Sequence, residues 1–135
     1  MHVLICDDDA AFGARMADYI HDYFEARSVQ LQTVVCTGAA EALRTPYLEL
    51  YQLAFLDVDM PGTNGIALGR ELKQRSPDIR LVYVSAYLEF APEGYTVNAY
   101  RYLLKRDIAR MLPKCLDDLL AAFTDQHRTL TVHHN

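Results

Sequence analysis

Short apolar runs alternate with longer helical patterns along the chain. Residues 2–6 form the first apolar run, and residues 10–26 follow with apolar side chains at spacings of three and four, as in an amphipathic helix. Residues 29–36 alternate apolar and polar positions, which is typical of a half-buried edge strand. A short helix is expected over 39–43, with Thr37 as its cap.

The second half of the chain continues this alternation. Residues 53–56 are all apolar, which indicates a central strand covered on both faces. A turn is predicted over 60–64, where proline and glycine occur together. The remaining predicted elements are, in chain order, a helix over 65–75, a strand over 79–84, a weakly helical segment over 87–99, a strand over 102–104 and a last helix to about His127.

Strands that alternate with helices through short connections predict a parallel sheet between two layers of helices. Such a sheet binds its ligands beyond the carboxyl ends of the strands, where the strand order reverses. Polar side chains follow four of the predicted strands. They are Asp7–Asp9 after the first, Asp57 and Asp59 at and after the end of the third, Ser85 after the fourth and Lys105 after the fifth.

A cluster formed by Asp7, Asp8 and Asp57 would either raise the pKa of some of these carboxylates or bind a cation. Oxygen ligands favour a hard octahedral ion, so Mg²⁺ is expected, with Mn²⁺ as a substitute. A carboxylate in such a site can attack a phosphoryl group and form an aspartyl phosphate. Lys105 would then pair with one phosphate oxygen, and the Ser85 hydroxyl would donate a hydrogen bond to another. Asp9 is expected to cap the following helix instead.

The composition restricts the class of protein. The length of 135 residues suits one domain, and 51% hydrophobic residues are ample for a core. A net charge of −5 argues against direct binding to nucleic acid. No leader or membrane span is recognisable, so we expect a cytoplasmic domain without membrane contact. Three widely spaced cysteines, Cys6, Cys36 and Cys115, indicate inert thiols rather than disulfides or a zinc site.

The motifs together resemble the receiver domain of two-component response regulators. They are Asp7-Asp8, residues 57–62 with Gly65, Ser85-Ala86 and Lys105. The resemblance covers nearly the whole chain. It implies a flavodoxin-like (βα)5 fold, doubly wound, with five parallel strands in the order 2-1-3-4-5.

The same resemblance implies roles for single residues and for partners. The partner would be a sensor histidine kinase, and a homodimer formed on phosphorylation is one expectation. The domain would not be an enzyme, although it would assist its own phosphotransfer and dephosphorylation. The implied site consists of Asp57 as phosphoacceptor with Lys105, Asp8 and Asp57 as direct metal ligands, Asp59 as a ligand through its backbone carbonyl, Asp7 as a ligand through water, and Ser85 with Tyr102 as a pair that rearranges on phosphorylation.

A narrower resemblance is to receivers that precede a LytTR-type DNA-binding domain. It rests on residues 89–91 and 97–105, and on residues 130–135, which look like the first strand of such a domain. The receiver is therefore expected over 1–127, with 128–135 as a linker or the start of an output domain absent from this chain. DNA would be bound only through that output domain.

Two positions depart from the usual receiver pattern. Arg106 stands where receivers have a proline, often after a cis bond, so a trans bond or a mobile Lys105 loop is expected. Pro113 falls inside the predicted last helix, where a proline costs roughly 3 kcal/mol. We therefore expect a new helix start with Pro113 in its first turn.

Other functions are weighed against this one. A haloacid-dehalogenase-type phosphatase would use Asp57, Asp59, Ser85, Lys105 and Asp117-Asp118 in that order. The apolar pattern around Asp117-Asp118 places those acids on the solvent face of a helix. In such a phosphatase, Asp7-Asp8 would also have no role. A pseudo-receiver that takes no phosphate, and a stand-alone shuttle receiver without an output domain, are the further alternatives.

Overall fold

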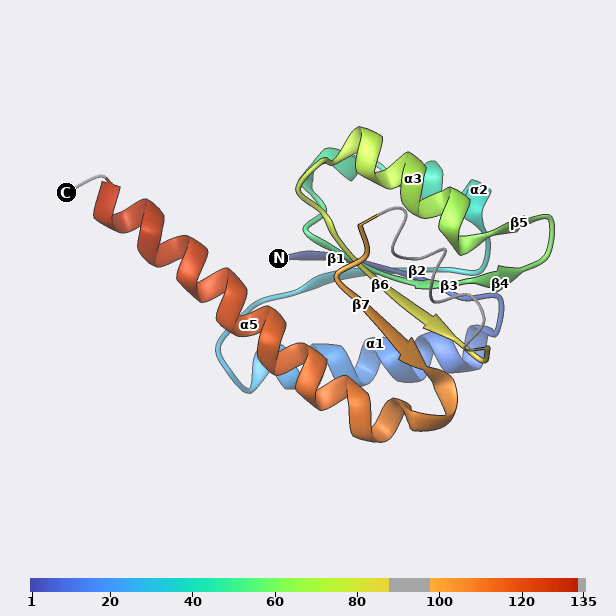
Figure 1. Cartoon of the computed structure of the whole chain (residues 1–135), viewed down its shortest axis with the longest axis horizontal. Coiled ribbons are helices and arrows are strands. Elements are labelled where there is room, and N and C mark those ends of the chain that lie inside the picture. The colour runs from blue at the N-terminus through green and yellow to red at the C-terminus, as the bar shows by residue number, and fades with distance from the viewer. Residues whose placement is uncertain (88–97, 134–135) are drawn as a thin grey trace.

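The computed structural model describes residues 1–87 and 98–133, with side chains except those of residue 63 and residues 126–133. A five-stranded sheet forms the centre of the fold, in the order β2-β1-β3-β6-β7 (Figure 1). All its neighbouring strands are parallel. Along the chain, β6 and β7 are the fourth and fifth strands of this sheet, so its order corresponds to the predicted 2-1-3-4-5. The predicted fold class and the predicted strand order are both confirmed.

The helices and strands follow the predicted elements closely, with one addition. Two strands of two residues each, β4 and β5, form an antiparallel hairpin where only a turn was predicted. The strands are β1 (His2–Cys6), β2 (Gln32–Cys36), β3 (Leu53–Asp57), β4 (Asp59–Met60), β5 (Thr63–Asn64), β6 (Arg80–Ser85) and β7 (Arg101–Leu104). The helices are α1 (Ala10–Glu25), α2 (Ala39–Leu43), α3 (Gly65–Arg75) and α5 (Ile108–His133), with 3₁₀ turns η1 (Leu48–Leu50) and η3 (Lys105–Asp107).

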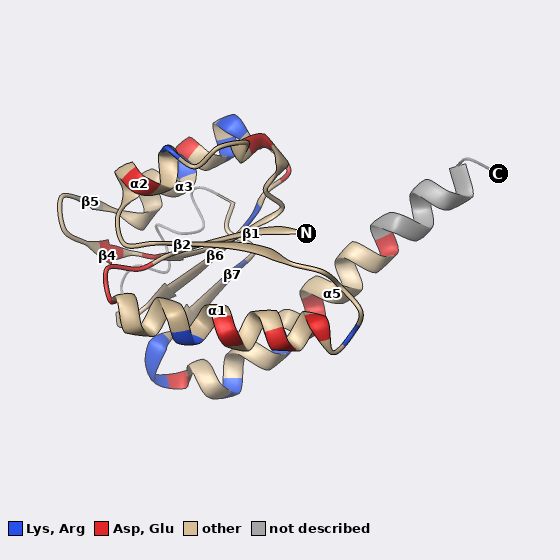
Figure 2. Ribbon diagram, turned by 180° about the vertical axis from the view of Figure 1, so that it is seen from behind, with Lys and Arg blue, Asp and Glu red and all other residues tan. Residues whose placement is uncertain are grey.

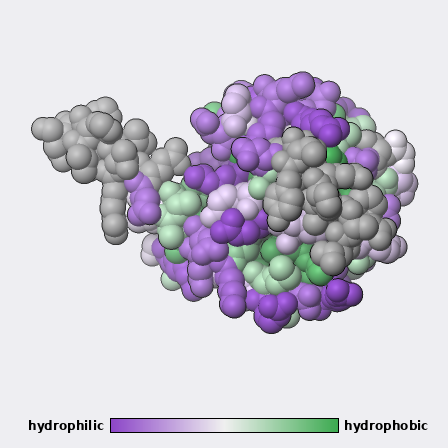
Figure 3. Space-filling model, in the orientation of Figure 1, coloured by the Kyte–Doolittle hydropathy of each residue, from purple (hydrophilic) through white to green (hydrophobic). Residues whose placement is uncertain are grey.

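Two layers of helices cover the sheet. α2 and α3 pack on one face, and α1 and α5 pack on the other (Figure 1). Alternate residues of β1 serve the two cores: Leu4 packs toward α2 and α3, and Ile5 packs toward α1 and α5. Every residue of β3 is buried, which confirms it as a central strand. On the face shown in Figure 3, apolar atoms gather around β7 and the start of α5.

The helix starts agree with prediction in one case and not in the other. Asp9 caps α1, because its Oδ1 accepts a hydrogen bond of 3.0 Å from the Phe12 N–H. The cap of α2 is Gly38, which offers no side-chain hydrogen bond, so the predicted cap at Thr37 is wrong. Thr37 lies one residue too early, because α2 begins at Ala39.

The C-terminal predictions need correction. α5 begins at Ile108 and continues to His133, so it is longer than predicted, and residues 130–133 are helical rather than strand-like. Pro113 lies inside this helix and not in a first turn. The helix persists because its apolar face packs on the sheet, which offsets the lost hydrogen bond. Leu112, Leu116 and Leu119 form that face.

Three further predictions concern the Lys105–Arg106 bond, the segment over 87–99 and membrane spans. The described residues contain no cis peptide bond, so the Lys105–Arg106 bond is trans. The weakly helical segment over 87–99 and the motif at 89–91 lie largely or wholly outside the described residues. Within residues 1–87 and 98–133, no helix is both long and apolar enough to cross a membrane.

Gly65 allows α3 to begin against the end of β3. Its N–H donates a hydrogen bond of 2.9 Å to the carbonyl of Val58, and a Cβ at this position would collide with the backbone carbonyl of Asp57. We predict that Gly65→Ala lowers the free energy of unfolding by about 2–4 kcal/mol, because backbone must move to relieve the clash. Urea denaturation of the purified protein measures this change.

Gly38→Ala is the matched control for this prediction. Gly38 has extended backbone, with φ of −158°, and a Cβ there has no neighbour within 4 Å. Its replacement should cost less than about 1 kcal/mol, since alanine is only a poorer helix cap. Equal losses for the two variants would contradict the importance of the close approach at Gly65.

Candidate functional site

The carboxyl ends of β1 and β3 bring three aspartates together. Asp7 and Asp57 are buried, with 3% and 4% of their surface exposed, whereas Asp8 is exposed. One carboxylate oxygen from each of the three lies within 4.8 Å of the others. Figure 2 shows acidic residues gathered where these strands end, near β4. The cluster predicted from the strand ends is therefore present.

Lys105 lies beside this cluster, at the edge of the sheet where its place after the last strand predicted it. It is the first residue of η3, directly after β7. Its Nζ lies 2.9 Å from Oδ2 of Asp7 and 3.6 Å from Oδ2 of Asp57. The same Nζ lies 4.6 Å from the centre of the Phe12 ring. In the sequence Phe12 is recognisable only as one apolar position of a helix, and no signal there indicates its contact with Lys105.

Backbone N–H groups hold the two buried carboxylates in place. The N–H of Asp9 donates to Oδ1 of Asp7 at 2.8 Å. The N–H of Asp59 donates to Oδ1 of Asp57 at 3.3 Å. The side chain of Asp59 itself is exposed. Each buried carboxylate therefore turns one oxygen to the backbone and the other toward Lys105.

Burial and neighbouring charge change the protonation of these groups. Burial raises the pKa of Asp57 to about 7, with a hydrogen bond to Asp8 and the charge of Asp7 acting in the same direction. The positive charge of Lys105 only partly opposes this rise. Burial acts to lower the pKa of Lys105 itself, but Asp7 and Asp57 outweigh burial and raise it. One ammonium group is thus insufficient for the negative charge that the site can carry.

The donor set fits a divalent cation. Three carboxylates from two strand ends offer hard oxygen atoms within one small volume, which suits Mg²⁺ or Mn²⁺ rather than a softer metal. Lys105 balances the negative charge of the three aspartates only in part, which gives a cation a reason to bind. The residues present are therefore compatible with the predicted metal.

Ser85 and Tyr102 both contact the backbone of Tyr87. Ser85 is fully buried at the end of β6, and its Oγ accepts a hydrogen bond of 3.0 Å from the Tyr87 N–H. The Tyr102 hydroxyl donates to the Tyr87 carbonyl at 2.8 Å. Sequence reasoning predicted the pair but missed Tyr87, because backbone groups carry no side-chain signal. The ring of Tyr102 lies 6.4 Å from that of Tyr83, and its side chain is partly buried.

The acid pair of the phosphatase alternative does not join the site. Asp117 and Asp118 are exposed on α5. Asp117 accepts a hydrogen bond from the Tyr23 hydroxyl near the end of α1, and Asp118 pairs with Arg101 at 3.2 Å. Arg101 is the first residue of β7, so these acids lie toward the opposite end of the sheet from Lys105.

The cysteines also take no part in the site. All three are free and buried. Burial raises the pKa of Cys6 and of Cys115 to about 12, and that of Cys36 to about 11. These thiols stay protonated at neutral pH, which agrees with the prediction that they are inert.

Comparisons with known proteins find relatives over most of the chain. The family model described as "Response regulator receiver domain" matches residues 3–116. An uncharacterized response regulatory protein of Shewanella oneidensis is 33% identical over 91% of this chain and 50% of its own length. The sensory transduction protein LytT of Enterococcus faecalis is 29% identical over 78% of this chain and 42% of its own length. The chain thus spans about half the length of these curated relatives.

Solved structures show the same fold. The response regulatory domain of protein mrkE from Klebsiella pneumoniae has a TM-score of 0.72 and 21% identity, with 93% of this chain and 99% of that chain covered. The response regulator protein TrrA of Thermotoga maritima, in complex with Mg(2+)-BeF, has a TM-score of 0.65 and 20% identity, with 87% and 97% covered.

The raised pKa of Asp57 yields a prediction about stability without metal. Folding raises this pKa from 3.8 to about 7, so the native protein binds more protons than the unfolded chain between these values, and its stability falls as the pH rises through them. Asp57→Asn removes the charge, and we predict a gain of about 1–3 kcal/mol at pH 8 in chelator. The gain should shrink toward pH 5, as measured by thermal unfolding.

Asp9→Asn serves as the control for the change in net charge. Asp9 is exposed, and asparagine is an equally good helix cap, so its stability should change by less than about 0.5 kcal/mol. Two results would contradict the view that the buried charge of Asp57 destabilises the fold. One is a loss of stability in Asp57→Asn at pH 8, and the other is an equal gain of stability in Asp9→Asn.

Proposed function

The chain belongs to the response regulator receiver domain family, and we propose that it works as a phosphate switch in which Asp57 accepts the phosphoryl group. The observation that carries this assignment is the placement of Asp57. It is buried at the end of β3 beside two other aspartates, within 3.6 Å of the one ammonium group of the cluster. A carboxylate held in this way is oriented for attack on phosphorus.

Metal binding is the second part of the proposal. Asp8 and Asp57 would hold Mg²⁺ directly, Asp59 would contribute its backbone carbonyl, and Asp7 would act through water. The bound cation would supply positive charge to the phosphoryl oxygens. The raised pKa of Asp57 supports this role, because burial and then the neighbouring Asp8 and Asp7 disfavour its charged form, and a cation would stabilise that form.

The residues of the site then have separate tasks in the transfer. An oxygen of Asp57 attacks phosphorus, and the bond from phosphorus to the donor's leaving group breaks with its electron pair. Lys105 pairs with a phosphate oxygen. To do so, its Nζ must leave Asp7, which is its nearest partner. Ser85 can donate its hydroxyl hydrogen to another oxygen, because its Oγ acts only as an acceptor among the described residues.

The partners of the domain follow from the family. The phosphodonor would be a sensor histidine kinase in the cytoplasm. The relatives that span twice this length include proteins named LytT and LytR, which favours a LytTR-type DNA-binding output domain beyond residues 1–127. Phosphorylation would control that domain, through a homodimer or through release of the output domain. A stand-alone shuttle is the remaining arrangement.

Phosphorylation of Asp57 is directly testable. Incubation with Mg²⁺ and acetyl phosphate should add one acid-labile phosphoryl group per chain, detected by intact mass spectrometry. Asp57→Asn should abolish the label, since the amide is not a nucleophile toward phosphorus. Chelation of the metal should also suppress labelling.

Asp59→Asn is the matched control, because its exposed side chain can change while its backbone carbonyl remains. This variant should keep most of the labelling. Robust labelling of Asp57→Asn would place the acceptor elsewhere. Steady turnover of phosphomonoesters would favour the phosphatase alternative.

The signal would pass from Ser85 to Tyr102 through the backbone of Tyr87. A phosphoryl group on Asp57 would attract the Ser85 hydroxyl, and this movement would disturb the hydrogen bond from the Tyr87 N–H. The Tyr102 hydroxyl donates to the carbonyl of the same residue, so its ring would be released together with Ser85. One new charged hydrogen bond supplies at most about 3 kcal/mol, so the shift should be partial.

NMR of tyrosine rings tests this transmission. Beryllofluoride with Mg²⁺ should move the Tyr102 ring signals, and Ser85→Ala should reduce that shift by at least about half because the attraction is lost. Tyr47 is 70% exposed and should report no change in either protein. Unchanged Tyr102 signals, with occupied Asp57 confirmed by fluorine NMR, would refute this role of Tyr102.

A further inference from the structure

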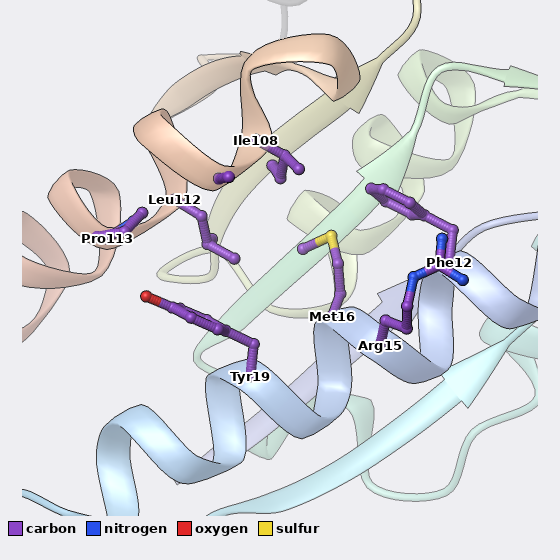
Figure 4. A pocket seen from close by; sticks show the side chains of 8 residues that line it. Phe12, Arg15, Met16, Tyr19, Ile108, Leu112 and Pro113 are labelled. Carbon is purple, nitrogen blue, oxygen red and sulfur yellow. The ribbon is translucent and has the colours of Figure 1, made fainter.

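A pocket with a volume of about 250 Å³ opens between α1 and α5 (Figure 4). Its walls are mainly apolar. Tyr19 and Met16 project from α1 toward Leu112 of α5, and Phe12 and Ile108 close the end nearest to η3. The neighbouring strand β7 leads directly into η3 and Lys105, so the pocket lies beside the phosphorylation site without being part of it.

The residues that line the pocket carry positive charge only. Arg15 is the one charged residue among those that line it. Its guanidinium carbon lies 5.9 Å from the centre of the Phe12 ring, and it has no carboxylate partner among the described residues. An apolar cavity with an unpaired cation at its wall suits a ligand that is apolar at one end and anionic at the other.

The size of the pocket restricts the ligand further. About 250 Å³ lies just below the range of drug-sized ligand pockets, which is about 300–1,000 Å³. A volume of this size suits a small molecule as the occupant.

Phe12 connects the pocket to the site. Its ring lines the pocket, and Nζ of Lys105 lies 4.6 Å from the centre of the same ring. Lys105 in turn holds Asp7 at 2.9 Å. Only one side chain therefore separates a pocket ligand from the ammonium group that must move when Asp57 takes phosphate.

We propose that this pocket binds a small apolar carboxylate, and that its occupancy slows phosphorylation of Asp57. A ligand would fill the space into which the Phe12 ring can retreat, and so would keep the ring against Lys105. Lys105 would then leave Asp7 less readily. The second part rests on the proposed function of Asp57, whereas binding itself does not.

Methyl NMR tests the binding part with octanoate as the probe and octylammonium as its opposite-charge counterpart. Met16 lines the pocket and Met111 does not, so ¹³C-methyl methionine labelling contains its own reference. Octanoate should shift the Met16 methyl signal in a saturable way and leave Met111 unchanged. Octylammonium should bind at least about tenfold more weakly, because Arg15 repels it.

Two alanines of α5 provide matched variants. Ala109 is exposed at the pocket wall, so Ala109→Phe should fill the space and abolish the Met16 response. Ala121 is exposed on the same helix and does not line the pocket, so Ala121→Phe should leave the response intact. Circular dichroism spectra of both variants should match that of the protein without a substitution.

Labelling kinetics test the coupling. Saturating octanoate should slow acetyl phosphate labelling about fivefold or more in the unmodified protein and in Ala121→Phe, but not in Ala109→Phe. Absence of a Met16 shift, or equal affinity for octylammonium, would overturn the ligand assignment whatever happens at Asp57. An unchanged labelling rate with Met16 saturated would overturn the coupling. A dimer that Ala109→Phe dissociates would show that a second copy fills the pocket, and would also overturn the proposal.

Discussion

Two buried carboxylates that share one ammonium group govern the site. Asp7 and Asp57 lie almost fully out of water, and Lys105 is nearest to Asp7. Charge on Asp57 is therefore poorly compensated, and its pKa rises to about 7. A structure that served stability alone would place an apolar residue here. The residual negative charge instead favours the binding of a divalent cation, which brings positive charge to the cluster.

The fold keeps this unfavourable arrangement in place through its backbone. Gly65 lets α3 start against the Asp57 carbonyl, and Asp9 fixes the start of α1 directly after the acid pair. Backbone N–H groups hold one oxygen of each buried carboxylate. Side chains in the cluster therefore have few alternative positions. We therefore expect a change of charge at Asp57 to be answered by Lys105 and by the Ser85 hydroxyl, which can turn toward a phosphoryl group.

The sequence was most informative where a side chain follows an apolar run. Polar residues after the strands predicted the cluster, because parallel strands bring their carboxyl ends to one edge. Contacts made by backbone or by ring faces have no such pattern, so Tyr87 and the contact between Phe12 and Lys105 were not predictable. The end of α5 was misjudged for another reason. Pro113 suggests a break, and only packing of the whole apolar face on the sheet shows that the helix continues.

Two physical connections leave the site in different directions. On one side, Ser85 and Tyr102 meet at the backbone of Tyr87, so that movement of either removes a hydrogen bond from the same residue. On the other side, Lys105 rests on Phe12, whose ring also faces the α1–α5 pocket. Under the proposed function, the first connection would carry information out of the site, because a phosphoryl group on Asp57 would disturb it. The second would carry information in, because a ligand in the pocket would restrain Lys105 beforehand. Since the two connections share no side chain, we expect that substitutions can alter the rate of phosphorylation and the response to it independently.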